Sequence, residues 1–114
     1  MVIEAFIIGK LSEILDVPVY AERPAEPPAE YVLVQKTSGG RSNWICRGTF
    51  AVQSYAATKI DAANLNEAVK KAMDGLIVYD RISGLELESD YPFPDTATKS
   101  YRYQAVYTMT FYEE

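Results

Sequence analysis

The hydrophobic and polar positions along the chain follow two periods, and the first of them is helical. In residues 3–15 apolar side chains recur every three to four positions, while Glu4, Lys10 and Glu13 fall mostly on the other side. This spacing predicts an amphipathic helix with one buried stripe. Asp16, which precedes a Val-Pro pair, is expected to end it.

A second helical stripe begins after Thr58. Its hydroxyl is expected to cap the helix, with Asp61 three residues on in an approximate capping box. Gly75 is a suitable C-terminal cap. The apolar positions that make up the stripe are Ile60, Leu65, Ala68, Val69, Ala72, Met73 and Leu76.

Strand patterns fill most of the remaining chain. Residues 23–30 hold three prolines and are expected to form an extended, exposed connector. The runs 31–40 and 47–56 predict a hairpin with a long arm. The first run ends at Gly39-Gly40, where a turn with unusual backbone angles is expected, and the tip is expected to be irregular around residues 42–46. The segments that predict strands are 17–22, 31–40, 47–56, 84–89 and 100–112.

The order of these elements predicts the fold class. Consecutive strands joined by short turns favour antiparallel pairing, and the two helices need an apolar surface to cover. We therefore expect an α+β fold, a mainly antiparallel sheet of about five strands with two helices packed on it. A chain of 114 residues is expected to form this as a single domain, residues 1–114.

Composition and charge narrow the classes of function. Apolar residues make up 48% of the chain and charged residues 24%, which predicts that the whole chain folds. The net charge is −5 and the lysines and arginines are scattered, so neither tight nonspecific nucleic-acid binding nor an acidic membrane is favoured. The apolar run at the start of the chain is broken by Glu4 and Lys10, so it does not resemble a signal peptide. We therefore expect a cytoplasmic protein.

Candidate chemistry is sparse. The chain has no histidine and its single cysteine, Cys46, cannot form an intramolecular disulfide or a thiolate and imidazole zinc cluster. Glu86, Glu88 and Asp90 are interpreted as a solvated strand face rather than metal ligands. The aromatic and basic runs NWICR and YRYQAVY could stack on single-stranded nucleic acid, but the acidic balance disfavours it. We expect no enzyme, no cofactor and no metal.

The ordered combination of elements resembles the tail terminator (tail completion) proteins of long-tailed bacteriophages. The matching pattern is the N-terminal helix, VPVYAERPAEPPAEYVLVQ entering the first long strand, GG at its end, GTFAVQSYAATKIDAANLNEAVKKAMDGL as strand then helix, and DYPFPDTATKSYRYQAVYTMTFY as loop and closing strand. It covers nearly the full chain, and none of its motifs is a catalytic signature.

The resemblance implies a structural protein that forms a homo-oligomeric ring, usually a hexamer, on the head-proximal end of a completed tail tube. Such a ring ends tube polymerisation and offers a surface to the head. The implied partners are other copies of the chain, the tail tube protein and the head-tail connector proteins, with DNA only as passing cargo and no membrane. The implied location is the virion tail, after assembly in the host cytoplasm.

Two alternatives stay open. A phage head-tail connector or neck protein shares the size and the α+β character. A small non-enzymatic α+β domain that binds a ligand or a peptide through its sheet belongs to a different class, and would stay small and respond to a ligand instead of forming rings.

The aromatic residues supply the candidate contact residues. Trp44 lies near the hairpin tip, where no core is evident, and is expected to contact a neighbouring subunit or the tube with Arg41 beside it; packing on its own sheet is the alternative. In the closing strand, Tyr107, Met109 and Phe111 are expected in the core. The candidates for a second subunit or tube contact, at the start of that strand, are Asp95, Tyr101, Arg102 and Tyr103.

Overall fold

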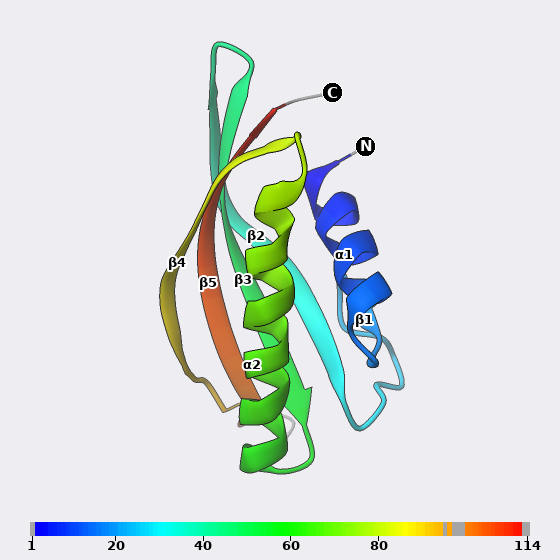
Figure 1. The fold of residues 1–114 in the computed structure, drawn as a ribbon. Helices are drawn as coiled ribbons and strands as arrows, with labels where there is room; N and C mark the ends of the chain where they lie inside the picture. The colour runs from blue at the N-terminus through cyan, green and yellow to red at the C-terminus, as the bar shows by residue number, and fades with distance from the viewer. Residues whose placement is uncertain (1, 95, 97–99, 113–114) are drawn as a thin grey trace.

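The two predicted helices form, and both cover the same face of one sheet (Figure 1). The computed structural model describes residues 2–94, 96 and 100–112 of the chain. Helix α1 spans Ile3–Ile14 and buries Ile3, Ile7 and Leu11 against the sheet. Leu15 is extended and a bend follows at residues 16–17, so the predicted first helix is confirmed.

Helix α2 spans Lys59–Asp74 and begins as predicted, because the Thr58 hydroxyl oxygen accepts a hydrogen bond from the Asp61 backbone N–H at 3.1 Å. Gly75 follows it in a right-handed conformation, so the chain continues into the 3₁₀ helix η1, Gly75–Val78. Two of the predicted stripe positions are wrong, since Ile60 and Ala68 are exposed. The buried stripe instead comprises Ala62, Leu65, Asn66, Val69, Ala72 and Met73.

The sheet has the strand order β1-β2-β3-β5-β4. Only the short β1 pairs in parallel with its neighbour, and all other pairs are antiparallel. The predicted α+β class is therefore confirmed. The strands are β1 Val19–Tyr20, β2 Tyr31–Ser42, β3 Ile45–Ala56, β4 Ile82–Pro92 and β5 Tyr101–Tyr112.

The β2–β3 hairpin corrects the expected irregular tip. Pairing continues to Ser42 opposite Ile45, and a two-residue turn, Asn43-Trp44, closes the hairpin. Both turn residues have positive φ, 50° and 72°, as in the turns whose twist matches that of paired strands. The residues at 39 and 40 lie inside the strand without positive φ, so the turn expected there is wrong.

Strand β4 is longer than predicted and carries a bulge that changes which way its side chains point. It includes residues 90–92, which the sequence assigned to a loop. The register shifts between Leu87 and Ser89, so that Glu86 lies opposite Thr108 while Asp90 lies opposite the buried Ala105. Asp90 therefore faces the helices, and its predicted place on a solvated acidic face is wrong because the extra residue reverses the alternation.

The core lies between the helices and the sheet. It contains Tyr107, Met109 and Phe111 of β5, as predicted, together with the buried stripes of both helices. The described residues extend 43 Å along their long axis and 25 and 24 Å across it. Figure 1 shows why: the tip of the β2–β3 hairpin projects past the ends of both helices. The proline-rich connector, residues 23–30, is largely exposed, as expected.

Candidate functional site

The distal half of the β2–β3 hairpin stands clear of the helices at one end of the molecule, and we call residues 36–49 the arm (Figure 1). Residues 35–45 are all exposed. The arm carries Lys36, Arg41 and Arg47 and no acidic residue. Toward its base the arm joins the core through Gly48, where a Cβ would lie 2.8 Å from the ring of Phe50. The arm is thus a positively charged projection anchored by close packing at its root.

Trp44 occupies the tip of the arm and is 80% exposed. Its side chain therefore does not pack on its own sheet, which was the alternative to a contact role. Its φ of 72° lies in the left-handed region, which favours glycine and costs other residues about 1–2 kcal/mol. Arg41 pairs with Cys46 two positions before the turn, so Arg41 and Trp44 both lie at the distal end of the arm.

The other candidate residues lie at the opposite end of the sheet. Tyr101 pairs with Ala56 at the start of β5, whereas Tyr112, at the other end of β5, pairs with Ile45 on the arm. At about 3.3 Å per residue the two ends of β5 are roughly 36 Å apart. The candidate contacts therefore form two separate surfaces.

A depression of about 250 Å³ brings three of these candidates together, and we call it the β5 hollow. Its walls join the start of α2, the end of β4 and the start of β5. Tyr101 is 45% exposed there. Asp95, the fourth candidate of this group, lies outside the described residues. The residues that line the hollow are Lys59, Pro92, Pro94, Tyr101, Arg102 and Tyr103.

Arg102 is engaged by its own chain. Its Nε donates to the Phe93 carbonyl oxygen at 2.7 Å and its guanidinium carbon lies 4.1 Å from the Phe93 ring centroid. One Nη also donates to the Tyr55 hydroxyl at 2.8 Å. Arg102 thus fixes the chain that follows β4 against the sheet, a positioning role that its place in the sequence did not indicate.

A row of polar side chains continues from Arg102 across the sheet face that is turned away from the helices. The Tyr55 hydroxyl donates to Gln53 Oε1 at 3.3 Å, and Gln53 Nε2 donates to Gln104 Oε1 at 2.7 Å. Gln104 in turn donates to the Tyr91 hydroxyl. Both glutamines are buried, and buried amides that are paired in this way fix one strand register.

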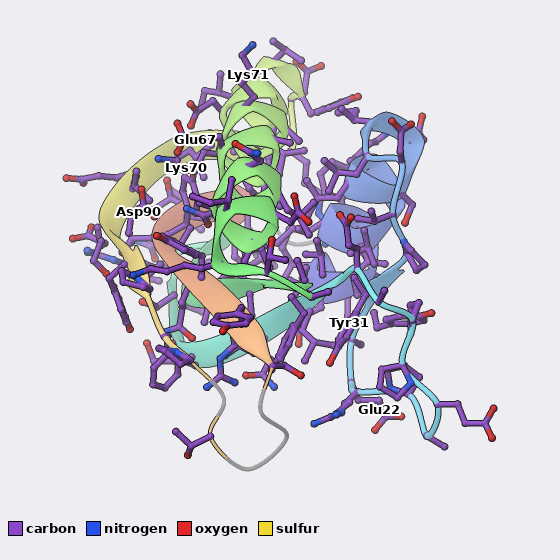
Figure 2. All side chains as sticks on the ribbon, turned by 90° about the horizontal axis from the view of Figure 1, so that it is seen from below. Glu22, Tyr31, Glu67, Lys70, Lys71 and Asp90 are labelled. Atoms are coloured by element: carbon purple, nitrogen blue, oxygen red, sulfur yellow. The ribbon has the colours of Figure 1, made fainter. Side chains whose placement is uncertain are left out.

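A second depression, of about 230 Å³, lies beneath the connector, and we call it the connector hollow. Pro27 and Pro28 form one wall and the stacked rings of Tyr31 and Tyr55, with centroids 4.5 Å apart, form another. Tyr31 lies where the connector rejoins the sheet (Figure 2). The other residues that line it are Ala29, Ala56, Ala57 and Ser100.

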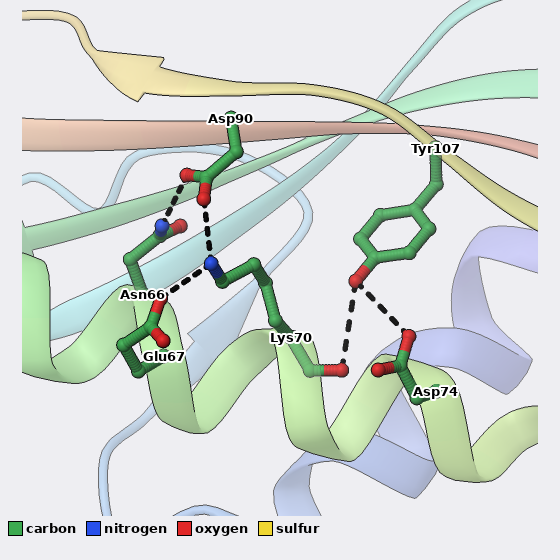
Figure 3. A network of polar contacts seen from close by, with 6 residues as sticks. All are labelled: Asn66, Glu67, Lys70, Asp74, Asp90 and Tyr107. Carbon is green, nitrogen blue, oxygen red and sulfur yellow. Dashed lines mark hydrogen bonds and ion pairs between the residues drawn. The ribbon is translucent and has the colours of Figure 1, made fainter.

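Helix α2 is tied to the bulge of β4 by a polar cluster (Figure 3). Asn66 Nδ2 and Lys70 Nζ each donate to one carboxylate oxygen of Asp90 at 2.5 Å, and Lys70 also pairs with Glu67. The hydrogen bond that Lys70 donates to Asp90 is the main reason that the pKa of Lys70 is raised. The amine is therefore a protonated cation near neutral pH, suited to holding α2 rather than to nucleophilic chemistry.

Tyr107 extends this cluster into the core. Its hydroxyl lies 3.4 Å from a carboxylate oxygen of Asp74 and 3.5 Å from the Lys70 carbonyl oxygen. Burial, followed by the charge of Asp74, raises the pKa of the Tyr107 hydroxyl well above its ordinary value. Tyr107 stays neutral, as a core tyrosine whose hydroxyl reaches polar partners should.

Across residues 2–94, 96 and 100–112, no three or more histidine, cysteine, aspartate or glutamate side chains are grouped so that they could hold a metal ion. Neither helix in these ranges has the length and apolar character needed to cross a membrane. A comparison with models of known protein families and a comparison with characterised protein sequences both find no match. Any assignment of function therefore depends on the surfaces described above and on the resemblance noted from the sequence.

Proposed function

We propose that the protein is a structural virion protein that assembles into a ring on the head-proximal end of a phage tail tube. The ring ends tube polymerisation and presents a surface for joining the head. The observation that carries this proposal is the arm, since it ends in a tryptophan that is 80% exposed and held in a backbone conformation that favours glycine. Neither property stabilises the free chain, so a contact with another molecule is the simplest use for both.

Two distinct surfaces support assembly in a ring. A ring closes through heterologous contacts, in which each subunit presents two different patches to its neighbours. The arm is one such patch, and the far end of the sheet offers the β5 hollow and the connector hollow as others. As the resemblance implies, we expect a hexamer in the virion tail, assembled in the host cytoplasm, with the tail tube and head-tail connector proteins as partners.

The size of three hollows among the described residues favours this proposal over a ligand-binding domain. Small-molecule pockets commonly enclose about 300–1,000 Å³. The connector hollow, the β5 hollow and a third depression along the arm measure about 230, 250 and 270 Å³. They are better suited to single side chains of a protein partner than to a free metabolite. A head-tail connector would use the same surfaces and differs in where it binds on the virion.

Sedimentation velocity across a concentration series, with and without purified tail tubes, tests the proposal. We expect self-association that tube ends promote, and negative-stain images with rings at one end of each tube. Added tubes that continue to elongate in the presence of excess protein would argue for the connector role. A chain that stays monomeric under all of these conditions would overturn the proposal.

A further inference from the structure

We infer that the arm of one copy docks on the connector hollow of a second copy of the same chain. This inference rests on the proposed function, because it takes self-association as given and names the two surfaces that meet. The indole of Trp44 would lie against Pro27 and Pro28, over the stacked rings of Tyr31 and Tyr55, which are each 3% exposed.

The arm has the properties of a donor. Its two strands are paired up to the turn, so the tip is presented by a preformed hairpin and little ordering accompanies docking. Trp44 is a large aromatic side chain with most of its surface in solvent. Tryptophan is among the residues that contribute most to protein contacts when a partner buries it.

Charge selects the acceptor. The arm holds three basic residues and no acidic one, while eight basic and 16 acidic residues remain in the rest of the chain. Two arms therefore repel each other, which disfavours a twofold dimer through the tips. The connector carries two acidic residues, Glu26 and Glu30, against one basic residue, Arg23, and both glutamates are exposed and adjacent in sequence to residues that line the hollow. An arm is attracted to the connector of another copy, and this pairing is head-to-tail.

The same reasoning separates the two hollows at the far end of the sheet. They are similar in volume, but Lys59 and Arg102 line the β5 hollow and would repel a positively charged arm. The residues described around the connector hollow are uncharged. Proline and aromatic walls also lose little conformational freedom on binding. The connector hollow therefore fits the arm better, and the β5 hollow is left for a different contact.

A nucleic acid is the less favoured partner for the arm. Three cations correspond to about three phosphate contacts, which gives weak and strongly salt-dependent binding. The remainder of the chain is acidic and would repel a phosphate backbone. A second copy offers acidic side chains and a hollow walled by proline together.

Mixing two complementary variants tests the docking. Trp44→Gly removes the side chain of the donor, and Ala29→Arg fills the acceptor and adds a positive charge; both positions are exposed, so both chains should fold. We expect each variant alone to be monomeric at concentrations where the wild type assembles. An equimolar mixture should give a heterodimer, detected by native mass spectrometry, because one intact arm and one intact hollow remain.

A charge exchange gives an independent measurement. Arg41→Glu with Arg47→Glu on the arm, and Glu26→Lys with Glu30→Lys on the connector, should each weaken association on the order of tenfold at low salt. Combining all four changes in one chain should recover affinity to within about threefold of the wild type, because the arm then carries two acidic residues and one basic residue and the attraction is restored with its sign reversed. Thermal melting of each variant verifies the fold.

The outcomes separate this inference from the proposed function. If wild-type chains and Ala29→Arg chains form the same rings, the arm does not dock on the connector hollow, while the proposed function stands. If wild-type chains never associate, with or without tail tubes, both the proposed function and this inference are wrong. Retention of single-stranded DNA that requires Trp44 and Arg47, without self-association, overturns the docking and assigns the arm to nucleic acid.

Discussion

Strands β2 and β3 are each continuous, yet their side chains are buried in one half and exposed in the other. In the body half, residues 31–34 and 50–56, every side chain is buried, and a polar row on one face is matched by an apolar core on the other. In the arm half, exposed positions follow one another without alternation and three of them are basic. Pairing alone therefore does not require burial, since β2 and β3 stay paired from one half to the other, with one register shift between Lys36 and Ser38.

The comparison separates positions whose side chains are required for folding from positions whose side chains are explained by contacts with another molecule. The body half is explained by its neighbours, because each side chain fills space between the helices or within the polar row. The arm half has no such neighbours, and its tip combines apolar exposure with backbone strain. Changes in the body should therefore be measured in the free energy of unfolding, and changes in the arm in association.

The largest loss of stability should come from the core beside the arm. Phe111→Ala removes a buried ring that lies near Phe50, with ring centroids 6.5 Å apart, and leaves a cavity. We expect the free energy of unfolding to fall by about 3–5 kcal/mol. Urea denaturation measures it, and Tyr112→Ala, at the next position and exposed, is the matched control. Equal losses from both changes would contradict the assigned faces of β5.

The polar cluster at the bulge should contribute less. Asp90→Ala leaves the buried Asn66 amide and the Lys70 ammonium without their shared acceptor, and hydrogen bonds to charged groups typically contribute about 1.5–3 kcal/mol. We expect a loss in that range. Glu86→Ala on the solvent side of the bulge is the control, with an expected change within about 0.5 kcal/mol. A larger effect at Glu86 would mean that the bulge does not reverse the strand.

The same cluster predicts alkaline sensitivity. The pKa values of Lys70 and Tyr107 are both raised in the folded state, from ordinary values of 10.5 and 10.0. Each group contributes fully to the free energy of unfolding while the pH is below its ordinary pKa. This contribution is lost as the pH rises through the raised pKa of the folded state. Above about pH 10 stability should fall by up to about 1.4 kcal/mol per pH unit for Tyr107, and by less for Lys70, because solvent screens its ion pairs.

Tyr107→Phe should flatten this alkaline decline. The variant removes one of the two titrating groups and keeps the ring in the core, so the slope of unfolding free energy against pH should decrease while the value at pH 7 changes by about 1 kcal/mol or less. Denaturation midpoints from pH 7 to pH 11 supply the measurement. An unchanged slope would show that Tyr107 ionises in the folded state as readily as in the unfolded one.

Tyr101 and Tyr103 provide a test at the far end of the sheet. Changing both to serine should cost less stability than Phe111→Ala, because Tyr101 is 45% exposed and Tyr103 is only partly buried. If the β5 hollow contacts the tail tube, the double variant should still self-associate and should lose binding to tube ends in a pelleting assay. Normal tube binding with a large loss of stability would make these tyrosines core residues only.

Periodicity alone predicted most of the fold. The boundaries of α1, the Thr58 cap and the buried face of β5 follow from apolar spacing and local hydrogen bonding, which act over a few residues. The bulge in β4 was not predictable, because one unpaired residue reverses every later side chain without changing the composition. Asn66 gave a weak signal, as a polar residue within an apolar stripe.

The candidate surfaces were predicted less completely. Sequence reasoning placed Trp44 and Arg41 on an exposed hairpin, because no core could be assigned there. It assigned the turn to two glycines, although the turn formed at Asn43-Trp44, where the preference for glycine is overridden. The connector hollow depends on contacts between residues more than 20 positions apart, and no local pattern indicates it.

The smallest effect on stability, and the sharpest test of the comparison, is Trp44→Gly. Relief of the left-handed strain should stabilise the folded chain by about 1–2 kcal/mol, while the greater freedom of glycine in the unfolded chain offsets about 0.4–1 kcal/mol of this. We therefore expect the free energy of unfolding to rise by roughly 0.5–1 kcal/mol, as measured by urea denaturation, while association measured by sedimentation weakens.

Val78→Ser is the matched control for this change. Val78 is 75% exposed at the end of η1, so the variant removes a similarly exposed apolar side chain from outside the arm. It should leave both stability and association unchanged. Trp44→Gly is expected to raise stability and weaken association. This combination distinguishes a residue that serves a contact from one that serves the fold. If Trp44→Gly destabilised the monomer and left assembly intact, Trp44 would contribute to the stability of the fold, as residues in the body half do, and not to association.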